Sequence, residues 1–92
     1  MRISVKWSNG GRAAYRDDEE RAIAAAYAVL DAADVLAADA FADYQHQWRD
    51  LDLMPDEMTG PGAVWVAACD AANAAATAGW HNPDAVWVEL SI

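Results

Sequence analysis

The chain has 92 residues, enough for one domain with a single core, and a net charge of −9 at neutral pH. Its 55% hydrophobic content and many aromatic residues exclude a disordered acidic tail, and the single cysteine excludes an internal disulfide. No apolar run approaches the ~20 residues of a membrane-spanning helix, and the acidity disfavours direct binding to nucleic acid or anionic membranes. We therefore expect one acidic, cytoplasmic domain over residues 1–92.

The two ends of the chain read as strands. Apolar and polar side chains alternate over residues 2–7, which predicts a half-buried strand. A turn rich in asparagine and glycine follows at 8–11, and residues 12–16 can return as the second strand of a hairpin. Residues 85–92 alternate in the same way, so we expect a closing strand that pairs with this hairpin.

The alanine-rich stretch after the hairpin favours helix as far as Asp50. Asp17 or Asp18 can cap its start. One face of the helical wheel is apolar and consists of Ile23, Ala26, Leu30, Ala37, Phe41, Tyr44 and Trp48. Because Asp34 lies at the edge of this face, one long helix and two shorter helices with a break at Asp31–Asp34 both fit the pattern.

Two more helical segments are predicted before the closing strand. A proline followed by two acids indicates one short turn at 54–58, and the glycines at 59–62 indicate a loop. Residues 63–78 then read as a helix that Gly79 ends. Its polar side is opposite the apolar one and carries Asp70, Asn73 and Thr77. Together the elements predict an α+β two-layer fold, in which alanine-rich helices cover a small antiparallel sheet made of the N-terminal hairpin and the C-terminal strand.

The charges are distributed unevenly along the chain. Residues 22–92 hold eleven acids against one basic residue, Arg49. On a helix, Asp39, Asp43, His46 and Asp50 would share one side, and the lysines that usually follow acids four positions later are absent. We expect this stripe to be solvated and unpaired. The candidate partner-binding residues are the acids of the stripe and those near it in the chain, namely Asp31, Asp39, Asp43, Asp50, Asp52, Asp56 and Glu57.

Two hypotheses account for unpaired acids. In the first, fixed carboxylates imitate duplex DNA, which carries one charge per ~1.7 Å of its axis, and bind a basic nucleic-acid-recognising cleft. In the alternative, the protein is an acidic accessory or interaction module of a halophilic or high-GC host, and the charge serves solubility. A halophilic surface should be acidic everywhere. Four cationic side chains near the N-terminus count against that alternative, namely Arg2, Lys6, Arg12 and Arg16.

In size, in charge and in the acidic layout of residues 31–57, the chain resembles the phage-encoded inhibitors of bacterial defence, the anti-CRISPR and antirestriction proteins. No motif carries this resemblance. It implies a DNA mimic that occupies the DNA-binding surface of a basic partner, such as a subunit of a CRISPR effector complex, in the host bacterial cytoplasm.

The residues give little support for catalysis or metal binding. Asp43-x-x-His46 has the spacing of metal ligands on one helix, but a bundle site needs a matching set on a second helix, where only Asp70 and His81 are available. Cys69 stands among alanines, as a buried inert thiol does. We therefore expect no enzyme, no cofactor and no metal.

Overall fold

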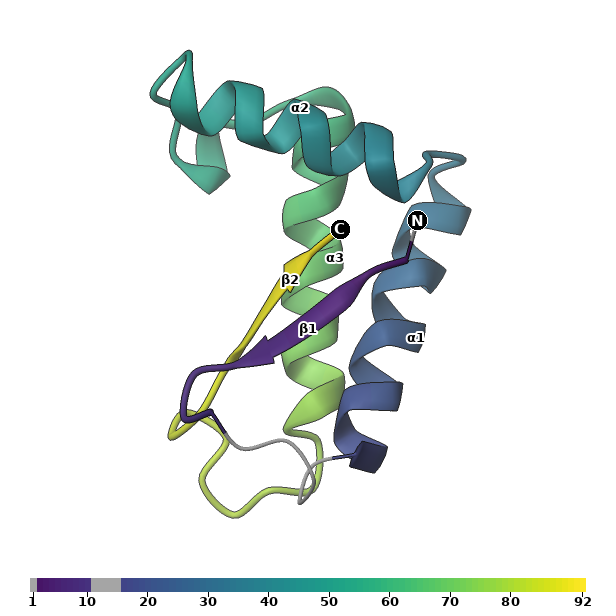
Figure 1. Cartoon of the computed structure of the whole chain (residues 1–92), viewed down its shortest axis with the longest axis vertical. Coiled ribbons are helices and arrows are strands. Elements are labelled where there is room, and N and C mark those ends of the chain that lie inside the picture. Colours follow the sequence, from purple (N-terminus) through teal and green to yellow (C-terminus); the bar gives the residue numbers. More distant parts are fainter. Residues whose placement is uncertain (1, 11–15) are drawn as a thin grey trace.

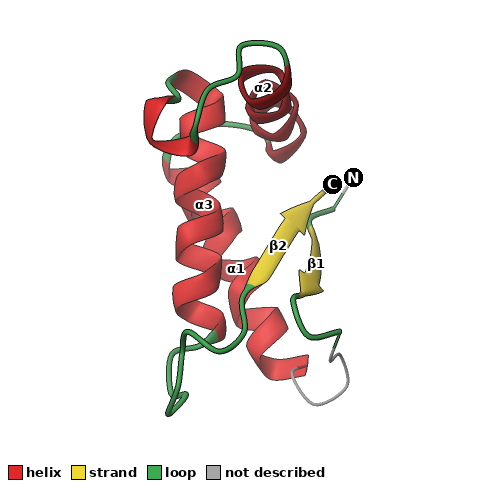
Figure 2. Ribbon diagram, turned by 90° about the vertical axis from the view of Figure 1, so that its left-hand side faces the viewer, coloured by secondary structure: helices red, strands yellow, loops and turns green. Residues whose placement is uncertain are grey.

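The computed structural model describes residues 2–10 and 16–92, which form a two-layer α+β fold (Figure 1). The elements in chain order are β1 (Ser4–Trp7), α1 (Arg16–Ala32), α2 (Ala37–Arg49), the 3-10 turn η2 (Pro55–Glu57), α3 (Gly60–Ala76) and β2 (Val88–Ser91). The two strands pair antiparallel and lie on one side of α1 and α3 (Figure 2). The predicted fold class and the pairing of the first and last strands are confirmed.

The expected return strand of the hairpin, residues 12–16, lies almost wholly outside the described residues. Its last residue, Arg16, begins α1 instead. Asp17 and Asp18 therefore lie in the first turn of α1, and the prediction that either one caps the helix is wrong. The turn before this segment is as expected, because Gly10 has a φ of 75° and donates its N–H to the carbonyl of Trp7.

The helical stretch breaks into two helices at Asp34, whose φ of 56° is left-handed and ends α1. The Val35 N–H then bonds to the Leu30 carbonyl at 3.0 Å. As a result α2 does not continue α1 but crosses the end of α3 (Figure 1). The break also removes the continuous helix on which a straight stripe from Asp31 to Asp50 depends.

The core lies where α1 and α3 pack against each other and against the inner face of the sheet. Half of its buried side chains are alanines, which allow the two helices to approach closely, and the full set is Ile3, Trp7, Ala22, Ala26, Leu30, Ala40, Trp65, Ala68, Ala72, Ala76, Val88 and Leu90. The ring of Trp65, 1% exposed, contacts Phe41 of α2 at a centroid distance of 4.9 Å. Trp65 thus joins α2 to the main core.

Two acids of the first turn of α1 serve this core. The indoles of Trp7 and Trp80 stack with centroids 6.0 Å apart and planes 9° from parallel. Their N–H groups donate to acids of α1, that of Trp7 to Glu19 at 3.2 Å and that of Trp80 to Asp18 at 3.3 Å. Buried indoles need such acceptors, so these carboxylates have a structural role.

Asn73 fastens β2 to α3. Its side-chain amide donates to the Val88 carbonyl at 3.1 Å, and its oxygen accepts the Val88 N–H at 2.8 Å. The prediction that Asn73 lies on the polar side opposite the core is therefore wrong. A carboxamide offers one donor and one acceptor in the arrangement of a peptide group, so Asn73 occupies the edge of β2 as a further strand would.

Candidate partner-binding site

The exposed acids of residues 31–57 gather at one end of the molecule. We define the acidic layer as residues 31–57, which comprise the last two residues of α1, then α2, η2 and the loops between them, and its exposed carboxylates are Asp31, Asp34, Asp39, Asp50, Asp52, Asp56 and Glu57. The layer crosses the end of α3, away from the lower ends of the strands (Figure 1). Six of these residues were predicted to bind a partner. Asp34 was missed, although its place between two of them in the chain points to it.

No described lysine or arginine neutralises the acidic layer. Across residues 2–10 and 16–92, the only ion pair that includes one of its carboxylates joins His46 Nδ1 to Asp50 Oδ2 at 2.9 Å. Arg21 pairs with Asp18, which lies outside the layer. Arg49, the last residue of α2, is the one lysine or arginine in the layer, and seven exposed carboxylates outnumber it. Such an excess of negative charge creates a field that extends about 8–10 Å into physiological solution and attracts a basic surface.

Asp43 does not belong to this exposed set. Its Oδ2 accepts the backbone N–H of Gly62 at 2.7 Å and the side-chain amide of Gln47 at 2.7 Å. The prediction that Asp43 is solvated and unpaired is wrong. The physical reason is the crossing of α2 over α3, because the first turn of a helix has free N–H groups and a positive dipole that a carboxylate satisfies.

Gln47 completes the contact between the two helices. It is 6% exposed, donates to the Thr59 carbonyl at 2.8 Å and accepts the Thr59 N–H at 3.2 Å. A Cβ on Gly62 would lie 2.5 Å from Gln47 Nε2 and 3.0 Å from Asp43 Oδ2, so a larger residue would displace the side chains that form this contact. We call Asp43, Gln47, Thr59 and Gly62 the polar joint. It also explains why the predicted loop at 59–62 is wrong, since α3 already begins at Gly60.

Replacement of Asp43 by alanine should lower the free energy of unfolding by about 1–2 kcal/mol, the usual cost of losing a helix-capping acceptor. Urea denaturation followed by circular dichroism measures this change. Asp39→Ala, on the same helix but exposed, is the control and should change stability by less than about 0.5 kcal/mol. Equal effects of the two substitutions would contradict the structural role of Asp43.

The acidic layer also carries most of the exposed large apolar side chains. Of the five in the described chain, four belong to this layer, namely Leu36, Trp48, Leu51 and Met54, and the fifth is Trp87. Trp48 is 44% exposed and stacks on Tyr44, with centroids 6.4 Å apart. Its predicted place on the core face is therefore wrong, because the end of α2 extends past α3. Exposed tryptophan, leucine and methionine are typical anchors of protein interfaces.

The structure also bears on metal binding, on the reactivity of Cys69 and on membrane insertion. In the described ranges, no group of three or more His, Cys, Asp or Glu side chains could hold a metal ion. Cys69 is half-buried, and burial, followed by the nearby Asp70 charge, raises the pKa of its thiol to about 11, so the thiol stays protonated at neutral pH. None of the described helices is long and apolar enough to cross a membrane.

Comparison of the chain with protein-family models, with curated proteins and with solved structures found no match. What the protein does is therefore inferred from its own contacts and charges.

Proposed function

We propose that this protein is a non-enzymatic inhibitor that binds a basic, nucleic-acid-recognising protein surface through its acidic layer. The observation that supports this function is that one layer combines an excess of carboxylates, none in an ion pair with a described lysine or arginine, with exposed apolar anchors. The carboxylates attract a basic partner from a distance and raise the association rate. The apolar anchors supply contacts that slow dissociation.

Imitation of DNA is the form of binding that this layout favours. Asp39 in the first turn of α2 and Asp50, the residue that directly follows it, are about 16 Å apart along the helix axis, at ~1.5 Å per residue. The remaining acids flank α2 at both ends, so the layer offers fixed anionic points over a distance greater than this helix alone. A cleft that holds the phosphates of a duplex has cations at comparable separations. A subunit of a CRISPR effector complex that recognises DNA is the partner we propose.

A displacement assay tests the proposal. The purified DNA-recognition subunit of a CRISPR effector complex is bound to a fluorescent duplex, and the protein is added at low salt. We expect the protein to release the duplex and the release to weaken as salt rises. The triple variant Asp39→Asn, Asp50→Asn and Asp52→Asn should be at least about tenfold weaker, chiefly through slower association.

A second triple variant separates position from total charge. Asp70→Asn, Asp84→Asn and Glu89→Gln also remove three negative charges, but from exposed positions outside the acidic layer. This variant should displace the duplex nearly as well as the natural protein. If both variants lost equal activity, or if no such subunit released its duplex, the charge would serve solubility and the proposed interface would be wrong.

A further inference from the structure

The free edge of β1 is a second surface with unused binding groups, and it is independent of the function proposed above. Antiparallel partners alternate between hydrogen-bonded and non-hydrogen-bonded pairs. Val88 is opposite Trp7, but both of its backbone groups bond to Asn73, so this pair is not hydrogen-bonded. The hydrogen-bonded pairs are therefore Lys6 with Glu89 and Ser4 with Ser91. The bond from Ser8 N–H to the Trp87 carbonyl continues this alternation.

The alternation fixes the direction of the Val5 backbone. Because the groups of Ser4 and Lys6 point to β2, the N–H and C=O of Val5 point to the opposite side. The Ile3 N–H points to the same side, but it already has a partner, because it donates to the Tyr27 hydroxyl at 2.9 Å. No hydrogen bond from any described residue reaches the N–H or C=O of Val5. Within the described part of the chain, one donor and one acceptor thus remain open on this edge.

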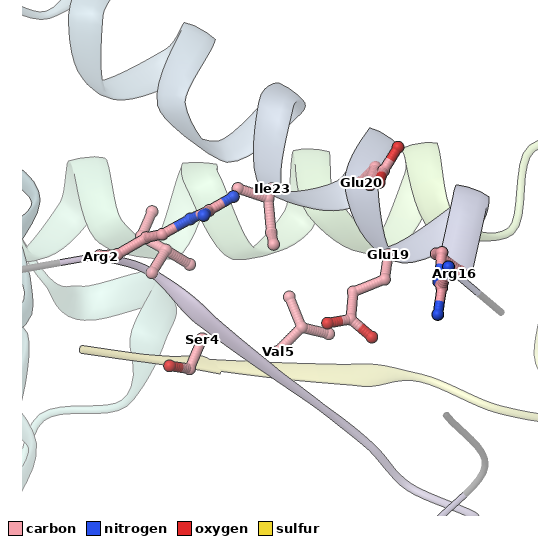
Figure 3. Close-up of a pocket in the computed structure, with 8 residues that line it drawn as sticks. Arg2, Ser4, Val5, Arg16, Glu19, Glu20 and Ile23 are labelled. Atoms are coloured by element: carbon pink, nitrogen blue, oxygen red, sulfur yellow. The ribbon is translucent and has the colours of Figure 1, made fainter. Parts of the chain in front are cut away.

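This edge borders an open groove between β1 and the first turns of α1, with a volume of about 970 Å³. We call it the β1 groove (Figure 3). Its apolar lining residues are Ile3 and Val5 from the strand and Ile23 from the helix, and the other five, Arg2, Ser4, Arg16, Glu19 and Glu20, are polar or charged. Arg2 lies at one end, and Arg16 and Glu19 lie at the other (Figure 3).

We propose that the β1 groove binds an extended peptide segment of another protein as a third, antiparallel strand of the sheet. The residue of the peptide opposite Val5 would exchange two backbone hydrogen bonds with it. Its side chain would point towards Ile23, which favours an apolar residue at this position. Residues on either side of it would point to solvent and be polar.

The surroundings of the groove indicate what kind of molecule binds there and in which order an antiparallel peptide would carry its charges. The helix α1 extends beyond β1 on this side (Figure 1), so a single added strand would pack against α1. A second copy of the whole domain, paired edge to edge, would bring its own α1 into the same layer. An antiparallel peptide places its C-terminal side beside Arg2 and its N-terminal side beside Glu19, Glu20 and Arg16, where the two acids outnumber the one base. We therefore infer a peptide with an acid after, and a base before, its apolar centre.

Selection from a displayed library of short random peptides, with the full chain as bait, tests this inference. The enriched sequences should show the base–apolar–acid order. A synthetic enriched peptide should shift the Val5 and Ile23 NMR signals and slow hydrogen exchange of the Val5 amide. N-methylation of the central peptide residue should weaken binding by about tenfold or more, because it removes one hydrogen bond and blocks the edge.

Val5→Pro is the matching change in the protein. Proline is tolerated on an edge strand where its missing N–H faces outward, so the fold should survive while peptide binding falls by about tenfold or more. Ser4→Ala is the control and should leave binding unchanged, because it keeps the backbone amide and removes only a hydroxyl on the face of the strand opposite Val5. Should Val5→Pro fail to fold, the N-methylated peptide gives the decisive comparison. An absence of enriched peptides, NMR shifts confined to α2, or equal binding by the methylated peptide would each overturn the inference.

Discussion

Replacement of Gln47 by leucine should lower the free energy of unfolding by about 3 kcal/mol, and it is one of the two largest effects we expect. Leucine fills similar space, but it leaves the N–H and C=O of Thr59 without their protein partners beside the buried Gln47 position, which is 6% exposed. It also removes one of the two hydrogen bonds to Asp43. Urea denaturation, followed by tryptophan fluorescence and by circular dichroism, measures the loss.

The control for this change is Gln45→Leu on the same helix. Gln45 is half-buried and has no hydrogen bond to a described residue, so its replacement should alter stability by less than about 1 kcal/mol. A Gln47→Leu protein as stable as the control would show that the polar joint contributes nothing. The remaining contacts between α2 and α3 would then be sufficient to hold α2 in place.

Replacement of Asn73 by leucine should lower the free energy of unfolding by about 2–3 kcal/mol. The change leaves both backbone groups of Val88 unpaired, and it opens the edge of β2 to other chains. We therefore expect faster aggregation as well, which light scattering at raised temperature detects.

Asp70→Leu provides the comparison, since Asp70 is exposed on the same helix and leucine has the same helix propensity at both positions. Its effect on unfolding should be small. If Asn73→Leu unfolded at the same urea concentration as Asp70→Leu, Asn73 would not be what fastens β2 to α3.

Local patterns predicted the elements well because they depend on neighbours in the chain. Alternation placed both strands, and alanine content placed the helices. The break at Asp34 stayed open, because an acid at the edge of an apolar face is compatible with either a kink or a continuous helix. Only the left-handed backbone of Asp34 decides between them.

The errors concern polar side chains whose roles depend on which elements cross. Asp43 and Asn73 have the chain neighbours of solvated residues, yet each bonds to the backbone of an element far along the sequence. The structural role of Gln47 could not be predicted from the sequence, because it depends on the contact with Thr59, a residue of another element. Glycine and proline at 60–62 resemble a loop locally, but Asp43 supplies the acceptor that lets a helix begin there.

The attachment of α2 by one side has a consequence for how this protein can change over generations. Its fully buried residues are only Ala40 and Gln47, while Ala37, Phe41 and Tyr44 pack partly buried against the core, and its outer side contributes little to the core. Substitutions on the outer side therefore alter recognition without the loss of folding stability that a core change brings. A lineage that faces a changing partner can vary its acids and anchors on α2 one at a time, while α1, α3 and the sheet stay as they are.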